Sequence, residues 1–300
     1  MAHIPVLLHE TLTGLMPQKG DTVLDGTAGA GGHALAFCRE VGERGTIIAL
    51  DADEQAVARA TENLKGCGAT VHVLHENFRN LKRALESLGT TKVDRILFDL
   101  GVSSFQLDQE GRGFSFRRDE PLAMTFAHVP DPEALTAREI VNEWEEEHIA
   151  DIIYGYGEER YSRTIARAMV AARRAHPIET THQLVEIIRS AVPARYANGR
   201  GIHFATRTFQ ALRITVNDEL GALKQGLEDG WAHLTEGGRI AVISFHSLED
   251  RIVKQFFKER EREGTAMIIT KKPVEASDEE QKENPRARSA KLRIAQKILT

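Results

Sequence analysis

The chain has 300 residues, of which 41% are hydrophobic and 28% charged, and its formal net charge is −5. This balance excludes a disordered tail and allows two domains. The apolar runs are no longer than a strand, and the first residues lack the basic flank and long apolar core of a signal peptide. We therefore expect a cytoplasmic protein with no membrane partner.

Strand-like and helix-like patterns alternate through the first part of the chain. Strands are predicted at 22–25, 45–51, 69–75 and 93–100, and helices at 33–41, 54–64 and 79–88. Such alternation is typical of a doubly wound α/β sheet, in which helices join parallel strands.

The pattern changes after Gly101, because no strand-like run occurs before about His203. Amphipathic helical segments are predicted instead at 136–146, 148–154, 161–176 and 181–191. Strand-like residues return at 239–245, followed by a helix from about Leu248 and by β-type runs at 266–270 and 291–298, the last of which also fits a helix. We expect a helical domain, 110–206, inserted between two parts of an α/β domain, 1–109 and 207–300.

A glycine-rich stretch, Asp25–His33, directly follows the first predicted strand and opens the next helix. Glycines let the backbone approach a ligand and adopt positive φ, and the helix N-terminus points its amides at the same place. The pattern therefore indicates a nucleotide-like ligand. Taken alone, it also satisfies the fingerprint of dinucleotide-binding proteins.

Three aspartates, Asp25, Asp51 and Asp99, end predicted strands at the edge where open α/β sheets bind ligands. Asp51 lies about twenty residues beyond the glycines, the usual offset for a carboxylate that binds a ribose diol. The other two would repel the pyrophosphate of NAD but attract the sulfonium and ammonium of S-adenosylmethionine. We therefore favour S-adenosylmethionine, although any one of these aspartates alone is also explained as the end of a strand in a turn.

Basic residues gather in three segments that lack carboxylates, although the whole chain is acidic. The segments contain Arg163, Arg167, Arg173 and Arg174; Arg189, Arg195, Arg200, Arg207 and Arg213; and Arg286, Arg288, Lys291, Arg293 and Lys297. They predict a localised phosphate-binding face for a nucleic acid. Solvated helix faces are the alternative explanation.

Metal and disulfide chemistry are not expected. The two cysteines, Cys38 and Cys67, belong to no metal-binding or redox motif, so we expect free thiols. His176 and His182 lack ligand spacing with a second histidine or cysteine, and no metal is predicted.

Motifs extend over essentially the whole chain: Asp25–His33, Phe98–Ser104, Arg112–Phe116, Tyr156–Arg160, Arg207–Arg213, Ser244–Arg251 and Asn284–Arg293. In order and spacing they resemble the bacterial ribosomal RNA small-subunit methyltransferase H family, also called RsmH or MraW. The resemblance implies a class I, Rossmann-like methyltransferase fold with an inserted helical substrate-recognition domain, and S-adenosylmethionine as cofactor. It also implies methylation of the exocyclic N4 of a cytidine in the decoding region of small-subunit (16S) ribosomal RNA.

The same resemblance assigns roles to single residues. The methionine part of the cofactor would lie on Gly31, Gly32 and His33, its ribose on Asp51 and its adenine near Phe78, with Asp99 and Gln106 at the floor and rim of the site. The chain departs from the family at Phe105, where proline is usual, and at Ala123–Phe126, which lacks a usual carboxylate and arginine. The second run therefore receives no role.

The N4 amine is a poor nucleophile because its lone pair is delocalised into the cytosine ring. Hydrogen-bond acceptors from Asp99, Ser103, Ser104 or the backbone carbonyls of 100–102 would localise that lone pair as the methyl group arrives. No strong base is needed, since the aminium formed by methylation is very acidic.

Two sets of residues have competing interpretations. His246 lies near Ser244, Ser247 and Asp250, but the partners of a hydrolase triad normally come from separate segments, so we expect Ser247 to cap a helix and His246 to contact the target base. Arg207 and Arg213 are predicted to bind the RNA substrate. Their structural alternative is packing against acidic neighbours such as Asp218 or Glu219.

Two other functions remain open from the sequence. An RNA-binding or ribosome-assembly protein would keep the fold only as a scaffold, but the presence of both Gly31 and Asp51 disfavours it. A methyltransferase acting on DNA or free RNA would share the cofactor residues, and only substrate assays separate it. The expected partner is small-subunit ribosomal RNA within the assembled small subunit, and the oligomeric state is left open.

Overall fold

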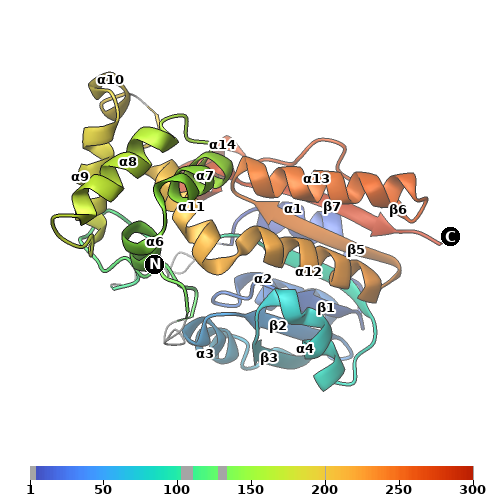
Figure 1. Ribbon diagram of the computed structural model, residues 1–300. Helices are drawn as coiled ribbons and strands as arrows, with labels where there is room; N and C mark the ends of the chain where they lie inside the picture. The colour runs from blue at the N-terminus through green and yellow to red at the C-terminus, as the bar shows by residue number, and fades with distance from the viewer. Residues whose placement is uncertain (1–4, 103–110, 128–133, 200, 300) are drawn as a thin grey trace. The chain divides into compact units, whose positions relative to one another are not determined.

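The computed structural model describes residues 5–102, 111–127, 134–199 and 201–299. The chain divides into two compact units (Figure 1), one formed by 1–101 and 220–300 and the other by 102–219. We refer to them as the sheet unit and the helical unit, and describe each by itself.

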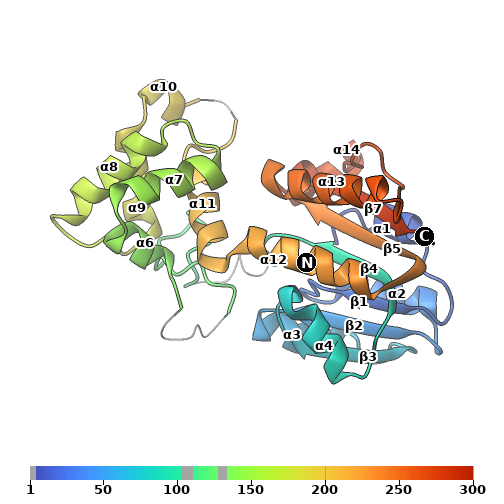
Figure 2. The ribbon, with the colours of Figure 1, turned by 45° about the vertical axis from the view of Figure 1, so that its right-hand side comes forward.

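The sheet unit contains one seven-stranded sheet with the order β3-β2-β1-β4-β5-β7-β6 (Figure 2). Its strands are β1 (Thr22–Asp25), β2 (Thr46–Asp51), β3 (Thr70–His75), β4 (Val93–Asp99), β5 (Leu234–Ser244), β6 (Ala266–Ile268) and β7 (Lys291–Lys297). The first five are parallel, whereas β7 runs antiparallel between β5 and β6. This is the arrangement of class I methyltransferases, and it confirms the predicted fold class.

The run at 291–298, whose pattern fitted either a strand or a helix, forms the strand β7. Its residues pair with β5 on one side and β6 on the other, and Leu292–Ala295 are buried. A central strand buried on both faces reads as a nearly continuous apolar run, which periodicity alone does not distinguish from a helix.

Helices cover both faces of the sheet because alternate strand residues point to opposite sides. Val23 and Ile47 face one core cluster, and Leu24 and Ile48 face the other. The first cluster includes residues of α1 (Leu8–Leu15), α2 (Gly32–Val41) and α3 (Glu54–Asn63); the second includes residues of α4 (Leu81–Ser87), α12 (Glu219–His233) and α13 (Ser247–Arg262). Short elements complete the unit: η1 (Phe78–Asn80), α14 (Asp278–Glu283) and η2 (Pro285–Ser289).

The expectation of free thiols is wrong, because Cys38 and Cys67 form a disulfide with a Cα–Cα distance of 5.8 Å. Cys38 lies on the buried face of α2, and Cys67 lies in the turn between α3 and β3. The doubly wound connection brings these segments together across 29 residues of sequence. No local motif marks such a pair, so cysteine spacing alone could not reveal it.

The helical unit consists of α6 (Ala137–Glu143), α7 (Glu146–Gly157), α8 (Ser162–Arg173), α9 (Thr181–Ala191), α10 (Ala194–Ala197) and α11 (Thr206–Asn217) around one apolar core. Capping boxes begin two of these helices, with Thr136 and Glu139 at α6 and Thr180 and Gln183 at α9. In the described part of the unit no strand forms, although Pro121 and Thr180 make one isolated bridge.

The helical unit extends to Glu219, whereas the sequence suggested an end at residue 206. The reason is the packing of α11 on α7. At Gly157 a Cβ atom would lie 2.5 Å from the carbonyl oxygen of Arg207, so the two backbones touch where glycine permits it. Thus α11 shares the core of the helices before it.

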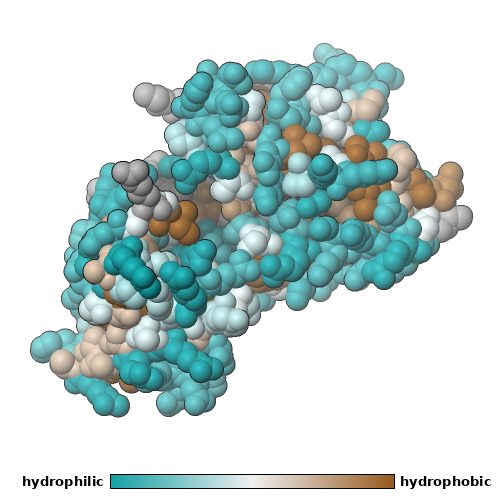
Figure 3. All heavy atoms as spheres, turned by 90° about the horizontal axis from the view of Figure 1, so that it is seen from above, coloured by the Kyte–Doolittle hydropathy of each residue, from teal (hydrophilic) through white to brown (hydrophobic). Residues whose placement is uncertain are grey.

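Among the described residues, no helix is both long and apolar enough to cross a membrane. Hydrophilic residues cover most of the face drawn in Figure 3.

Candidate active site

The glycine-rich turn after β1 is held between two neighbouring strands. The Gly26 N–H donates to the Leu97 carbonyl at 2.9 Å, and the Ala28 N–H donates to the Leu50 carbonyl at 2.8 Å. Gly31 has a φ of 83° and directly precedes α2, a conformation that side chains disfavour. The predicted turn, with its amides at a helix N-terminus, is therefore present and fixed in position.

Asp51 at the end of β2 organises this turn. One carboxylate oxygen, Oδ2, accepts the Gly29 N–H at 2.8 Å, and the other, Oδ1, accepts the Asp53 N–H at 2.9 Å. Asp53 in turn caps α3. Burial raises the pKa of Asp51 to about 6, although these hydrogen bonds act in the opposite direction.

Asp25 lies buried at the end of β1. Its Oδ1 accepts the Thr27 N–H at 3.1 Å. Burial raises the pKa of Asp25 to about 7, and the negative charge of Asp51 adds to the shift. The Thr27 hydroxyl also hydrogen-bonds to Asp25 and accepts the Asp99 N–H at 2.6 Å, so this residue connects two of the strand-end aspartates.

Asp99 at the end of β4 is the third member of the group. Burial, followed by the charges of Asp25 and Glu249, raises its pKa well above the usual range of a carboxyl group. Its Oδ1 is buried and has no hydrogen-bond partner among the described residues. Its Oδ2 lies 3.7 Å from Nδ1 of His33. The sequence thus predicted correctly that the three strand ends meet.

A group of three carboxylates with raised pKa values, one buried and two partly buried, is suited to a cationic ligand. Ionising them in a poorly solvated site is costly, and a nearby positive charge lowers that cost. A pyrophosphate would instead add negative charge to the same place.

Phe78 lies next to the turn, and its partly buried ring packs against the core, so its expected contact with adenine stays a prediction. The ring packs on Phe98 with ring centroids 5.0 Å apart. A Cβ atom on Gly226 would lie 2.5 Å from the Phe78 ring, and one on Gly26 would lie 3.1 Å from the Phe78 Cβ. The two glycines therefore leave the space that this ring occupies.

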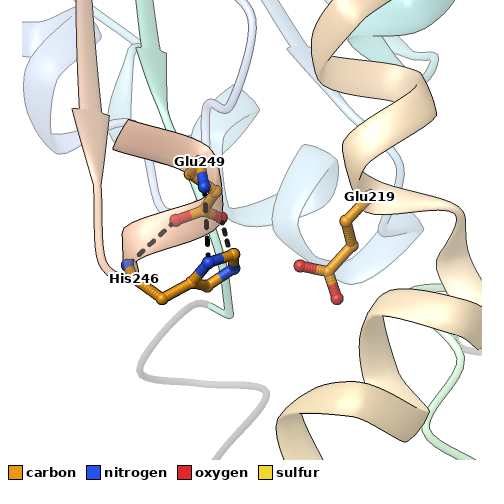
Figure 4. A group of neighbouring side chains, drawn as sticks. All are labelled: Glu219, His246 and Glu249. Carbon is orange, nitrogen blue, oxygen red and sulfur yellow. Dashed lines mark hydrogen bonds and ion pairs between the residues drawn. The ribbon is translucent and has the colours of Figure 1, made fainter. Parts of the chain in front are cut away.

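His246 is the residue that caps α13, and the predicted cap Ser247 is instead its first helical residue. Nδ1 of His246 accepts the Glu249 N–H at 3.4 Å, and Nε2 lies 3.2 Å from Oε1 of Glu249 (Figure 4). Glu249 Oε2 accepts the N–H groups of Phe245 and His246. The reciprocal capping box uses Nδ1, whereas Nε2 is buried and makes no hydrogen bond among the described residues, so the expected contact of His246 with the target base stays a prediction.

The sequence did not indicate Glu249 as a site residue, although it lies buried beside Asp99 and contributes to its raised pKa. A capping-box pattern with glutamate three residues after the cap is visible, but histidine is an unusual cap and the nearby serine was the better candidate. The neighbouring Asp250 pairs with Arg293 of β7 through two contacts of 2.6 and 3.1 Å.

Three predicted site residues, Ser103, Ser104 and Gln106, lie outside the described residues. The chain that leads to them is placed by the Leu100 N–H, which donates to the Ile243 carbonyl at 2.9 Å. Their roles stay predictions, as does the expectation that no metal takes part.

In the helical unit, Arg207 and Arg213 make structural contacts. Arg213 pairs with Glu219 through Nε–Oε1 and Nη2–Oε2 distances of 2.7 and 2.9 Å, and both side chains are largely buried. Arg207 Nη1 donates to the Glu158 carbonyl at the C-terminus of α7, 2.9 Å away. The acidic-neighbour alternative therefore describes Arg213 well, and its predicted contact with RNA stays a prediction.

The Ala123–Phe126 run also has a structural explanation within the helical unit. The Asn217 side chain donates to the Met124 carbonyl at 2.7 Å and accepts the Phe126 N–H at 2.8 Å. These two hydrogen bonds hold a segment in which Met124 has a φ of 59°.

The strand order, the glycine-rich turn and the carboxylates together define a class I methyltransferase-type site. The model of the MraW methylase family matches residues 1–298. A ribosomal RNA small subunit methyltransferase H of Heliobacterium modesticaldum is 49% identical to this chain and covers 99% of it and 98% of its own length. Those of Symbiobacterium thermophilum and Deinococcus radiodurans are 48% identical, covering 99% of this chain and 96% and 90% of their own lengths. This chain belongs to the MraW methylase family, which confirms the resemblance seen in its motifs.

We predict that Arg213→Ala destabilises the protein by about 3 kcal/mol, because it leaves the Glu219 carboxylate buried without its bidentate partner. Arg167→Ala is the matched control. Its pair with Glu146 is solvent-exposed and 3.5 Å long, so we expect a loss below about 1 kcal/mol. Urea unfolding measures both values. Unchanged stability of Arg213→Ala together with weakened RNA binding would show that this arginine serves the substrate instead.

Proposed function

We propose that this protein is an S-adenosylmethionine-dependent methyltransferase that modifies the exocyclic N4 of a cytidine in small-subunit ribosomal RNA. The observation that carries the proposal is the group of carboxylates at the ends of β1, β2 and β4. Asp25 is buried and Asp99 beside it is partly buried, and neither has a lysine or arginine partner in the described chain. The names of the relatives, ribosomal RNA small subunit methyltransferase H, support the substrate.

The residues present fit the cofactor. Asp25 and Asp99 would face its cationic groups, and Oδ1 of Asp99, which has no hydrogen-bond partner among the described residues, could accept a hydrogen bond from it. Asp51 would accept hydrogen bonds from the ribose hydroxyls, and the backbone of Gly31–His33 would hold the methionine part. The Phe78 region would hold adenine, and Gln106 would lie at the rim.

S-adenosylmethionine supplies an electrophilic methyl group on a sulfonium leaving group. The chain must hold the cytosine amine in line with that methyl group, and positioning alone can contribute up to about 7–11 kcal/mol. Asp99, the carbonyl of Leu100 and the hydroxyls of Ser103 and Ser104 would accept hydrogen bonds from the amine, which localises its lone pair. The target base must be unstacked, so an unpaired nucleotide is the expected substrate.

His246 contributes indirectly in this proposal. Its ring and Glu249 form the cap that begins α13, and Glu249 lies close enough to Asp99 to affect its pKa. We therefore assign His246 a positioning role through Glu249.

The assembled small subunit is the proposed substrate. A net charge of −5 disfavours indiscriminate RNA binding, so productive docking needs a folded surface that presents several phosphates to localised arginines. The exposed basic residues of the acid-free segments include Arg163 and Arg195 in the helical unit. They also include Arg288 in the sheet unit.

We predict that Asp51→Ala weakens binding of S-adenosylmethionine and of its demethylated product by about tenfold or more, since hydrogen bonds to a charged group contribute roughly 1.5–3 kcal/mol each. Calorimetric titration measures both affinities. Glu54→Ala is the control, because Glu54 is an exposed carboxylate in the first turn of the neighbouring α3. Equal affinities of Asp51→Ala and the parent would remove Asp51 from the cofactor site.

We also predict that the reaction product is N4-methylcytidine, formed readily in small subunits from a strain lacking the enzyme and poorly in deproteinised RNA. Nucleoside mass spectrometry after each reaction identifies the methylated atom. Methyl on cytosine C5 would contradict attack by the amine. Equally fast methylation of naked RNA would refute the docking argument and leave the cofactor chemistry intact.

A further inference from the structure

The imidazole of His33 is a buried titratable group that the proposed chemistry does not yet use. Its Nε2 lies 3.1 Å from the carbonyl oxygen of Val6. A carbonyl only accepts hydrogen bonds, so Nε2 carries a proton. In the neutral ring Nδ1 is then an acceptor, and it is the nitrogen that faces Asp99.

The two oxygens of Asp99 have different surroundings. Oδ2 lies 3.7 Å from Nδ1 of His33, less than 1 Å beyond an ordinary hydrogen bond. Oδ1 is buried and has no hydrogen-bond partner among the described residues. The Asp99 N–H is fixed on the Thr27 hydroxyl at 2.6 Å, which holds this end of β4 in place. One oxygen is thus directed to the histidine and the other is left for a ligand.

We propose that the Asp99–His33 pair takes up the proton that the target amine loses on methylation, with Asp99 as the catalytic acceptor and His33 as the positioning residue behind it. This inference rests on the proposed function, because it assigns a destination to the proton of that reaction.

Before transfer the pair holds one proton between Oδ2 of Asp99 and Nδ1 of His33, and the 3.7 Å that separates these atoms must shorten by less than 1 Å for them to share it. The amine nitrogen forms a bond to the methyl carbon, the carbon–sulfur bond breaks with its electron pair going to sulfur, and the nitrogen becomes an aminium. Oδ1 accepts the aminium proton and the shared proton moves fully to Nδ1. The pair then holds two protons, which leaves a neutral carboxyl group and an imidazolium.

The groups around the pair favour holding protons. Asp25 of β1 and Glu249 of α13 both contribute negative charge at Asp99, and His246 is engaged with Glu249. No lysine or arginine pairs with Asp99 within the described residues. A second proton on the pair therefore reduces repulsion among these carboxylates.

The kinetic test uses His33→Asn, with methyl transfer to small subunits followed in single turnovers across pH. We expect the rate at saturating cofactor to fall by about tenfold or more, with a displaced acid limb of the pH profile and cofactor affinity within about threefold of the parent. His233→Asn is the matched control, because its Nδ1 lies 2.7 Å from a carbonyl oxygen, that of Asp229, near the end of α12. We expect its rate to stay within about twofold of the parent.

A second test needs no substrate. Nitrogen-15 NMR of histidine-labelled protein, with the His33 signals assigned by their loss in His33→Asn, reports the protonation of each ring nitrogen. We expect Nε2 protonated and Nδ1 sharing a proton, and we expect Asp99→Asn to change Nδ1 to a nitrogen that only accepts.

The outcomes separate the two proposals. The proposed proton uptake by the Asp99–His33 pair is overturned if His33→Asn keeps the parental rate and pH profile. It is also overturned if the Nδ1 signal of His33 is the same in Asp99→Asn as in the parent. Loss of thermal stability and cofactor affinity with an unchanged pH profile also overturns it, because His33 would then be merely structural. A parent that binds the cofactor but methylates no cytidine contradicts the proposed function instead, and the NMR result still decides whether the pair shares a proton.

Discussion

The site depends on the burial of like charges at one edge of the sheet. Parallel strands β1, β2 and β4 are neighbours, so the aspartates that end them are forced together. Each carboxylate loses hydration, and each ionised neighbour makes ionisation of the next more costly. If these carboxylates only stabilised the fold, a lysine or arginine would be expected to form an ion pair with them. A ligand that brings positive charge removes the same repulsion when it binds.

The rest of the sheet unit keeps this edge rigid. The glycine-rich turn is hydrogen-bonded to both neighbouring strands, and Asp51 and Thr27 link it to the side chains of the site. On the far side of β4, the buried Glu249 lies in the first turn of α13, and the Asp250–Arg293 pair holds that helix against β7. Side chains that orient the carboxylates are therefore themselves fixed by packing and hydrogen bonds, as a preorganised site requires.

The predictable parts of the fold are those with a strong local pattern. The first four strands were placed to within a residue, because short runs rich in β-branched and other apolar residues, separated by helical patterns, leave few alternatives. Parallel strands end on one side of a sheet, so the sequence alone groups Asp25, Asp51 and Asp99 at one edge.

The features that sequence reasoning missed depend on tertiary neighbours. The cap on α13 is His246 rather than Ser247, because the chain direction at the end of β5 decides which residue meets the first turn. The Cys38–Cys67 disulfide joins segments that only the wound sheet brings together. The end of the helical unit at Glu219 reflects packing of α11 on α7 and the Arg213–Glu219 pair, which a search for acid-free segments cannot anticipate.

If these carboxylates bind a cationic ligand, protons are released on binding, and measuring that release is the most direct test. The pKa of Asp25 is about 7 and that of Asp51 about 6 in the ligand-free protein, so Asp25 is largely protonated near pH 6. A cationic ligand favours the ionised form, so binding must release protons below pH 7 and affinity must rise with pH up to about that value.

Titration calorimetry with S-adenosylmethionine between about pH 5.5 and 7, in buffers of different ionisation enthalpy, measures this release while the amino group of the ligand stays protonated. We predict net proton release that decreases in Asp25→Asn. A pH-independent affinity with no proton release across this range would contradict the account.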